Sequence, residues 1–178
     1  VPVCPAVYII PGETRQAAED KKALVDSLAK PVDGLALLSE ALNFDFGSKP
    51  LDEPFTDDEM ANISGLRGIL DRVVRESGKE NPTVSDFVTF SKRGTTGEFP
   101  VFCGTPTDIA DQMEDWFTSG ACDGFVVAAT HVPGGYEDVG QFVVPELQRR
   151  GIFRKDYSGR TLRENLGVPR AEIGDWRQ

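Results

Sequence analysis

The stretch Asp123-Gly-Phe-Val-Val-Ala-Ala-Thr130 decides the fold class, because a continuous apolar run between polar residues is typical of a strand buried in a parallel sheet. Residues 3–10 form a second apolar run, which ends at Pro11-Gly12 and predicts another buried strand. Thr14 then begins a helical pattern, so strand, tight turn and helix follow one another as in the first half of a parallel unit. The sequence therefore predicts an α/β protein.

The segments on either side of residues 123–130 predict helices. Before that stretch, Thr105 is the expected N-cap, Pro106 occupies the first helical position, and Asp108 follows three residues after the cap. We expect this helix over residues 106–118, after a short extended piece at residues 99–103. A second helix is expected over residues 138–150, where Pro145 should kink or restart it.

Residues 31–98 form a long excursion between the two halves of this pattern. Residues 63–74 carry a helical apolar stripe, and Thr83 to Asp86 resemble a capping box before another helix. Residues 43–62 are expected to be a surface loop. The acidic cluster in this loop, Asp57-Asp58-Glu59, could bind a cation, but a solvated loop is the favoured interpretation.

Only two runs have the pattern of good strands, and two parallel strands cannot bury both faces of a sheet. The sequence is therefore expected to be a piece of something larger, whose open face is covered either by a missing segment or by another copy of the chain.

Charge and composition exclude several classes of function. The 178 residues include 19 basic and 29 acidic ones, a net charge of -10, which argues against nucleic-acid binding. The mean hydropathy is -0.28, and no apolar run approaches the roughly 20 residues that span a bilayer. Three widely spaced cysteines without a CxxC motif predict a reducing, cytoplasmic compartment. His131 is the single histidine, so no metal site is expected.

A series of motifs carries a family resemblance. It is densest from about residue 99 to residue 169, and it is looser before residue 99. The motifs are Cys103-Gly-Thr-Pro-Thr-Asp-Ile-Ala-Asp-Gln-Met-Glu-Asp-Trp-Phe117, Gly120-Ala-Cys-Asp-Gly-Phe125, Val132-Pro-Gly-Gly135, Val143-Val-Pro-Glu-Leu-Gln-Arg-Arg-Gly-Ile-Phe153 and Gly159-Arg-Thr-Leu-Arg-Glu-Asn-Leu-Gly167. Together they resemble the C-terminal part of flavin-dependent, bacterial-luciferase-like monooxygenases. The most similar branch contains nitrilotriacetate monooxygenase component A and the dibenzothiophene-sulfone monooxygenases.

The resemblance implies the C-terminal portion of a TIM (β/α)8 barrel, about the last two βα units, with a large insertion. Residues 1–178 would form a single partial barrel domain, in which strands one to six, with most of the flavin contacts, are absent. The implied elements are strand seven at 3–10, the insertion at about 31–98, helix seven at 106–118, strand eight at 124–130, helix eight at 138–150 and a C-terminal tail at about 152–178.

A barrel enzyme has its active site at the carboxyl ends of the strands. On this mapping Thr130, His131 and the turn Val132-Pro133-Gly134-Gly135 would line the flavin and substrate pocket, with His131 as a catalytic proton donor or acceptor. The alternative is that the turn only leads into helix eight and that His131 is a core residue. The segment Gly104-Thr105-Pro106 could bind an anion at a helix N-terminus, although a plain helix cap is the favoured interpretation. This segment is expected at the end of the barrel opposite the active site.

Two functions remain open at this point. In the first, the chain is part of a two-component monooxygenase that uses reduced FMN and O2 to oxygenate a small organic substrate, with no metal. A separate NAD(P)H:FMN reductase supplies the reduced flavin, and the isolated chain is expected to be inactive. In the second, the chain is a truncated, non-catalytic fragment or interaction module that binds no flavin.

Overall fold

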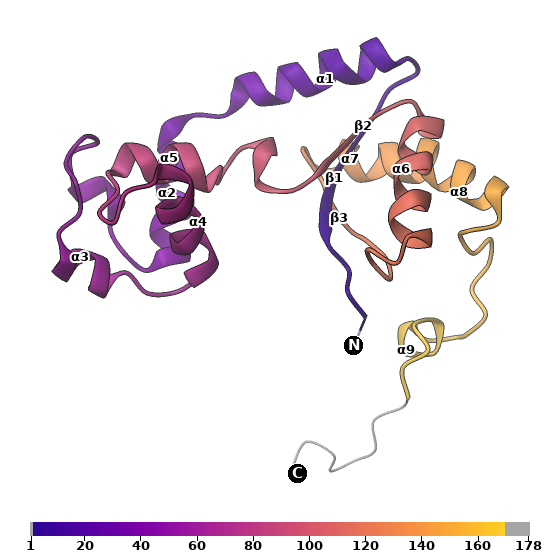
Figure 1. Ribbon diagram of the computed structural model, residues 1–178. Coiled ribbons are helices and arrows are strands. Elements are labelled where there is room, and N and C mark those ends of the chain that lie inside the picture. The colour runs from indigo at the N-terminus through magenta and orange to yellow at the C-terminus, as the bar shows by residue number, and fades with distance from the viewer. Residues whose placement is uncertain (1, 170–178) are drawn as a thin grey trace.

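The computed structural model describes residues 2–169, and its centre is a parallel sheet of three strands in the order β2-β1-β3 (Figure 1). The middle strand is β1 (Ala6–Pro11), and β3 (Val126–Ala128) pairs with it from Ala6–Val126 to Tyr8–Ala128. The parallel pairing that the two apolar runs predict is therefore confirmed.

The third strand, β2 (Val101–Gly104), is formed by residues expected to be only a short extended piece. It runs parallel to β1, with Tyr8 opposite Val101 and Pro11 opposite Gly104. The N–H group of Gly12 donates to the carbonyl oxygen of Gly104 at 3.0 Å. The expectation that Gly104 lies at the opposite end of the sheet is therefore wrong, because the extended piece is itself a parallel strand.

Helices cover one face of this sheet. They are α6 (Pro106–Thr118) and a continuous helical segment made of α7 (Gly134–Asp138), a π-helical turn η3 (Val139–Val143) and α8 (Val144–Arg150). The wide turn lies just before Pro145, whose missing N–H group cannot continue a regular helix. The buried core on this face consists of Val7, Ile9, Phe102, Ile109, Ala110, Val143 and Leu147.

Helix α1 (Arg15–Leu28) leads from the sheet to a separate cluster of helices (Figure 1). We call residues 31–91 the helical unit. Its elements are α2 (Pro31–Leu42), the short 3-10 turn η1 (Phe46–Ser48), α3 (Asp57–Asn62), α4 (Arg67–Ser77) and α5 (Val84–Ser91). A second 3-10 turn, η2 (Thr96–Glu98), connects α5 to β2.

The helical unit has its own hydrophobic core. The buried residues are Leu38, Leu42, Phe46, Phe55, Ile63, Leu70, Val73, Val84 and Phe87. Three of the aromatic rings pack edge to face or tilted, with Phe87 centred 5.0 Å from Phe46 and 5.2 Å from Phe55. Because every member of this cluster lies between residues 38 and 87, the unit is held together by local contacts.

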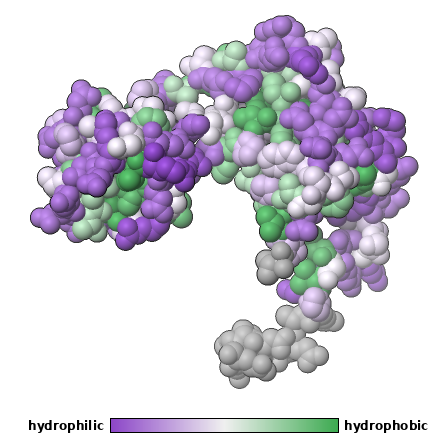
Figure 2. All heavy atoms as spheres, viewed as in Figure 1, coloured by the Kyte–Doolittle hydropathy of each residue, from purple (hydrophilic) through white to green (hydrophobic). Residues whose placement is uncertain are grey.

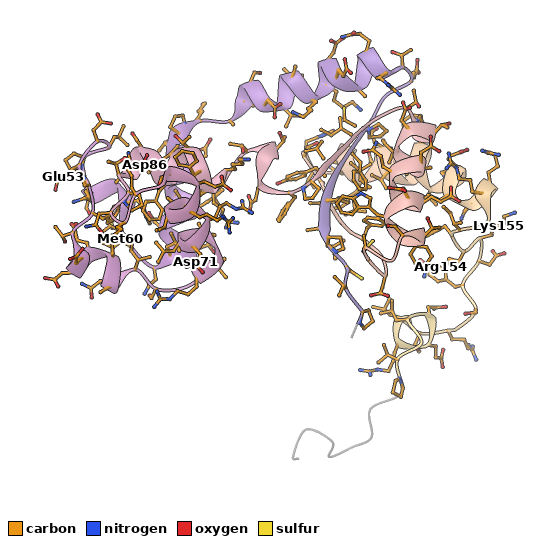
Figure 3. The ribbon with its side chains drawn as sticks, in the orientation of Figure 1. Glu53, Met60, Asp71, Asp86, Arg154 and Lys155 are labelled. Atoms are coloured by element: carbon orange, nitrogen blue, oxygen red, sulfur yellow. The ribbon has the colours of Figure 1, made fainter. Side chains whose placement is uncertain are left out.

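The acidic cluster at residues 57–59 is the first turn of helix α3, so the expectation of a loop throughout residues 43–62 is wrong. Thr56 and Glu59 form a capping box there, and acidic side chains in a first turn interact favourably with the helix dipole. Lys49 pairs with Glu59 at 3.0 Å and with Glu53, which is labelled in Figure 3, at 2.9 Å.

The tail begins after α8. The guanidinium of Arg154, which is labelled in Figure 3, lies 5.3 Å from the ring centre of Phe153 and 4.9 Å from that of Tyr157. A last short helix, α9 (Leu162–Asn165), has no buried residue. Within residues 2–169, none of the helices combines the length and the apolar character needed to cross a bilayer.

Candidate functional site

Two of the six predicted site residues, Thr130 and His131, line an open pocket of about 520 Å³ between α1 and the sheet, which we call the α1 pocket. It joins helix α1, the start of α2, the segment before β2 and the end of β3. Figure 2 shows apolar residues at the surface below α1, beside the strands. The lining residues are Tyr8, Lys21, Leu24, Val25, Leu28, Ala29, Asp33, Leu37, Gly94, Thr95, Thr96, Glu98, Ala129, Thr130 and His131.

Thr130 and His131 reach the α1 pocket because they directly follow strand β3. The Oγ1 atom of Thr130 lies 3.2 Å from Nδ1 of His131, so the hydroxyl orients the imidazole. His131 is exposed and not part of either hydrophobic core. The imidazole is therefore accessible to a ligand in the pocket.

The other four predicted residues form the turn behind His131 and do not line the pocket. The side chain of Val132 is 77% exposed. A Cβ atom at Gly134 would lie 2.6 Å from Nε2 of His131, and one at Gly135 would lie 3.1 Å from Cβ of Ala129. The two glycines thus make room for neighbouring side chains, whereas Pro133 precedes the first turn of α7.

Lys21 also lines the α1 pocket, and no local sequence pattern points to it. Its Nζ atom donates to the carbonyl oxygen of Pro11, at the end of β1, at 3.0 Å. The same atom pairs with Oδ2 of Asp138, in α7, at 2.8 Å, and both side chains are partly buried. Lys21 therefore ties α1 to the central strand and to the helix that follows the His131 turn.

Tyr8 faces the pocket because it alternates along β1 with Val7 and Ile9, which point into the core on the other face. Burial, together with the negative charge of Glu98, raises the pKa of the Tyr8 phenol. Its hydroxyl therefore stays protonated at neutral pH and is available as a hydrogen-bond donor. Glu98 itself forms an ion pair with Arg93.

The start of α6 behaves as a helix cap, as favoured from the sequence. Oγ1 of Thr105 accepts from the N–H group of Asp108 at 3.2 Å, and the carboxylate of Asp108 accepts from the N–H group of Thr105 at 2.9 Å. Hydrogen bonds from Arg15 and Thr105 lower the pKa of Asp108 to about 2. The chain's own carboxylate thus occupies the position that an external anion would take.

No cluster of three or more histidine, cysteine or acidic side chains suited to a metal ion is found among residues 2–169. The three cysteines, Cys4, Cys103 and Cys122, are free thiols. The α1 pocket therefore offers an aliphatic wall, a phenol, threonine hydroxyls, a few charged side chains and one accessible imidazole.

The sequence is similar to those of known monooxygenases, although no family model matches it. Nitrilotriacetate monooxygenase component A from Aminobacter aminovorans is 36% identical over 94% of this chain and 37% of that protein. Dibenzothiophene-sulfone monooxygenase from Rhodococcus erythropolis is 34% identical over 92% of this chain and 36% of that protein. The chain thus spans a little over a third of the length of these curated relatives.

Solved structures agree with the sequence comparison. DmoA from Hyphomicrobium sulfonivorans superposes with a TM-score of 0.62 at 30% identity, over 90% of this chain and 33% of that one. Riboflavin lyase (RcaE), solved with modified FMN and riboflavin, shares the fold with a TM-score of 0.69 at 24% identity, over 93% of this chain and 35% of that one. Over nearly its whole length the chain is therefore similar to part of these monooxygenases, as its motifs predict.

Proposed function

We propose that this chain is the C-terminal portion of a TIM barrel in an FMN-dependent two-component monooxygenase. The observation that carries the proposal is the similarity to such enzymes over 94% of the chain. The complete protein would use reduced FMN and O2 to oxygenate a small organic substrate. A separate NAD(P)H:FMN reductase would supply the reduced flavin, which implies a cytoplasmic location where NAD(P)H is available.

In this proposal β1 and β3 are two neighbouring barrel strands, and the helical unit is an insertion between the barrel segments. The parallel pairing of the two strands and the helices packed on one face support it. The opposite face, which carries Tyr8, would then look into the barrel, and the α1 pocket would form part of the active-site wall. Residues 1–178 would thus be one partial barrel domain with a tail from about residue 152.

The α1 pocket fits part of a flavin ring or a substrate, but it does not fit the flavin phosphate. A phosphate group needs cationic side chains or free helix N-terminal N–H groups. The only lysine in the lining is already paired with Asp138, Glu98 is paired with Arg93, and Asp33 brings negative charge. The phosphate contacts would therefore come from the missing N-terminal barrel segment. When bound, the reduced flavin supplies the oxygen-activating chemistry.

The residues of this chain would orient the reactants and exclude water. Thr130 positions the imidazole of His131, which would donate or accept a proton at the reacting group. The aliphatic side chains of α1 would keep water from the substrate, because they offer it no hydrogen-bond partner. The turn from Val132 to Gly135 would set the position of the imidazole.

The test uses the complete protein that contains this sequence, with reduced FMN supplied chemically and O2 as oxidant. We expect oxygenated product, and we expect His131→Ala to lower turnover by roughly 10²–10⁴-fold without unfolding the protein, because general acid–base groups contribute that much. Leu66→Ala, at an exposed position of the helical unit, is the matched control and should leave turnover unchanged.

Three outcomes would each overturn one part of this proposal. If the complete protein neither binds FMN nor forms product, the chain is a non-catalytic fragment or interaction module. If His131→Ala leaves turnover, coupling and substrate affinity intact, the assignment of His131 fails while the enzyme class survives. If the 178-residue chain alone retains FMN through gel filtration, the missing segment is not the source of the phosphate contacts.

A further inference from the structure

We propose that the α1 pocket selects an uncharged, largely apolar organic substrate and rejects polycarboxylates. This inference rests on the proposed function and names the substrate class of its site. The pocket volume of about 520 Å³ lies within the range of small-molecule sites. The question is therefore which chemistry its wall recognises.

The wall that α1 and α2 present is aliphatic. Leu24, Val25 and Leu28 lie along α1, and Leu37 of α2 continues the same surface. Leu24 and Leu28 are 61% and 66% exposed, so each still has a large apolar area that a ligand can cover. Burying that area against an apolar molecule is favourable by roughly 25 cal/mol per Å².

The charges around the pocket disfavour an anion. The single cationic lining residue, Lys21, is neutralised by Asp138 at 2.8 Å and also donates to the carbonyl oxygen of Pro11. Glu98 is paired with Arg93, so Asp33 is the carboxylate of the lining that faces this space without a described ion pair. A polycarboxylate would lose its hydration and meet this like charge, and both effects oppose binding.

The polar groups across the pocket from the aliphatic wall suit a ligand with one neutral hydrogen-bond acceptor. Tyr8 from β1 and Thr130 after β3 present hydroxyl groups, and His131 presents an imidazole. A molecule with an apolar body and a single sulfonyl, ether or carbonyl oxygen would pack its body against Leu24 and Leu28 and accept a hydrogen bond from this side.

The test measures binding to the 178-residue chain, without flavin or oxygen, by shifts of its leucine and valine methyl resonances. Dibenzothiophene sulfone is the neutral probe, and nitrilotriacetate is the anionic probe. We expect saturable shifts at Leu24, Leu28 and Leu37 with the neutral probe, and binding at least about tenfold weaker for nitrilotriacetate, a difference of about 1.4 kcal/mol.

Two lysine variants give the matched comparison. Leu28→Lys adds a cation to the wall, so it should weaken the neutral probe about tenfold or more and strengthen nitrilotriacetate. Leu66→Lys makes the same change at a position that is 57% exposed and outside the pocket, and it should change neither affinity. Circular dichroism of both variants checks that the fold is retained.

The proposal is overturned if nitrilotriacetate binds the chain as tightly as the neutral probe, or if the neutral probe causes no saturable methyl shift. It is also overturned if Leu24 and Leu28 stop responding to the neutral probe in the complete protein, because another part of the polypeptide then covers them. These outcomes do not depend on turnover. A complete protein that fails to oxygenate would instead refute the proposed function and leave the binding preference standing.

Discussion

At the residue scale, Lys21 holds together the two halves of the α1 pocket. Its ammonium group satisfies the carbonyl oxygen of Pro11 and the carboxylate of Asp138, which belong to different elements. Lys21→Met should destabilise the fold by about 1–3 kcal/mol, because it leaves a partly buried carboxylate without its charged hydrogen bond.

Urea unfolding measures this loss, and Lys22→Met is the matched control. Lys22 pairs with Asp26, which lies one turn further along the same helix. Ion pairs of this kind stabilise a helix by about 0.2–0.5 kcal/mol. Equal losses for the two variants would contradict the role assigned to Lys21.

Gly134 is required for space and not for backbone freedom. It is the first residue of α7, and it is not among the glycines with positive φ. Gly134→Ala places a Cβ atom 2.6 Å from Nε2 of His131, so the imidazole must move. We expect the ring resonances of His131 to shift and its contact with Thr130 to be lost.

The control for this variant is Gly140→Ala, because a Cβ atom at Gly140 meets nothing within 4 Å. The His131 resonances should stay in place in that variant. If Gly134→Ala also leaves them in place, the turn does not determine the position of the imidazole.

Asp108 makes the stability of the fold depend on pH in the acidic range. Hydrogen bonds from Arg15 and Thr105 lower its pKa from 3.8 to about 2. A carboxyl group whose folded-state pKa is lowered contributes stability above its ordinary pKa, and it loses that contribution as the pH falls toward the folded-state pKa. The wild-type chain should therefore be more stable than Asp108→Asn above about pH 5.

The difference in unfolding free energy should shrink between about pH 4 and pH 2. Urea titrations at several pH values measure it. Comparing the two chains at each pH removes the contribution of Glu146, whose pKa is also lowered to about 2 by Arg149 and Arg150. A difference that is independent of pH would show that the capping box contributes nothing through charge.

At the scale of elements, the chain contains two separate hydrophobic cores. Phe87→Ala removes a fully buried ring that contacts Phe46 and Phe55, and such a change costs about 3–5 kcal/mol. Because that core has no member in the sheet, amide hydrogen exchange should accelerate in the helical unit and much less in β1.

Ile109→Ala tests the other hydrophobic core, which lies against the sheet. Ile109 is fully buried in the other core, so its truncation should accelerate exchange in β1 and α6 while leaving α4 and α5 protected. Uniform acceleration in both variants would show that the two cores unfold as one cooperative unit.

The elements with strong local patterns were predictable from the sequence. The two apolar runs gave β1 and β3, and the cap at Thr105 gave the start of α6. Strand β2 was missed as a strand because its four residues are too few for a periodicity to stand out. Helix α3 was missed because it has no buried residue, although Thr56 and Glu59 show the same capping pattern as Thr83 and Asp86.

The site was predictable only in part, for a related reason. Thr130 and His131 follow an apolar strand, so their place in the chain indicates their place in the fold. Lys21 and Asp138 are 117 residues apart and carry no local signal of their pairing. The part of the pocket that the sequence misses is thus the part formed by long-range contacts.

At the scale of the whole molecule, the sheet has two edge strands, β2 and β3, and the β3 edge lies beside an apolar pocket. Strand β3 pairs only with β1 among the described residues, and Val126 is 54% exposed. Near it lies a second pocket of about 340 Å³ between α6 and α8, lined in part by Phe117 and Phe153, which are 54% and 40% exposed. An open strand beside an apolar groove favours association with another strand or another chain.

The 178-residue chain should therefore self-associate through this edge at micromolar concentrations, whereas the complete protein should protect it. Val126→Lys places a charge on the exposed edge and should shift the chain toward the monomer in sedimentation. Leu51→Lys, at a position that is 52% exposed in the helical unit, is the control and should leave the association unchanged. A compact monomer with slowly exchanging β3 amides at every concentration would contradict this prediction.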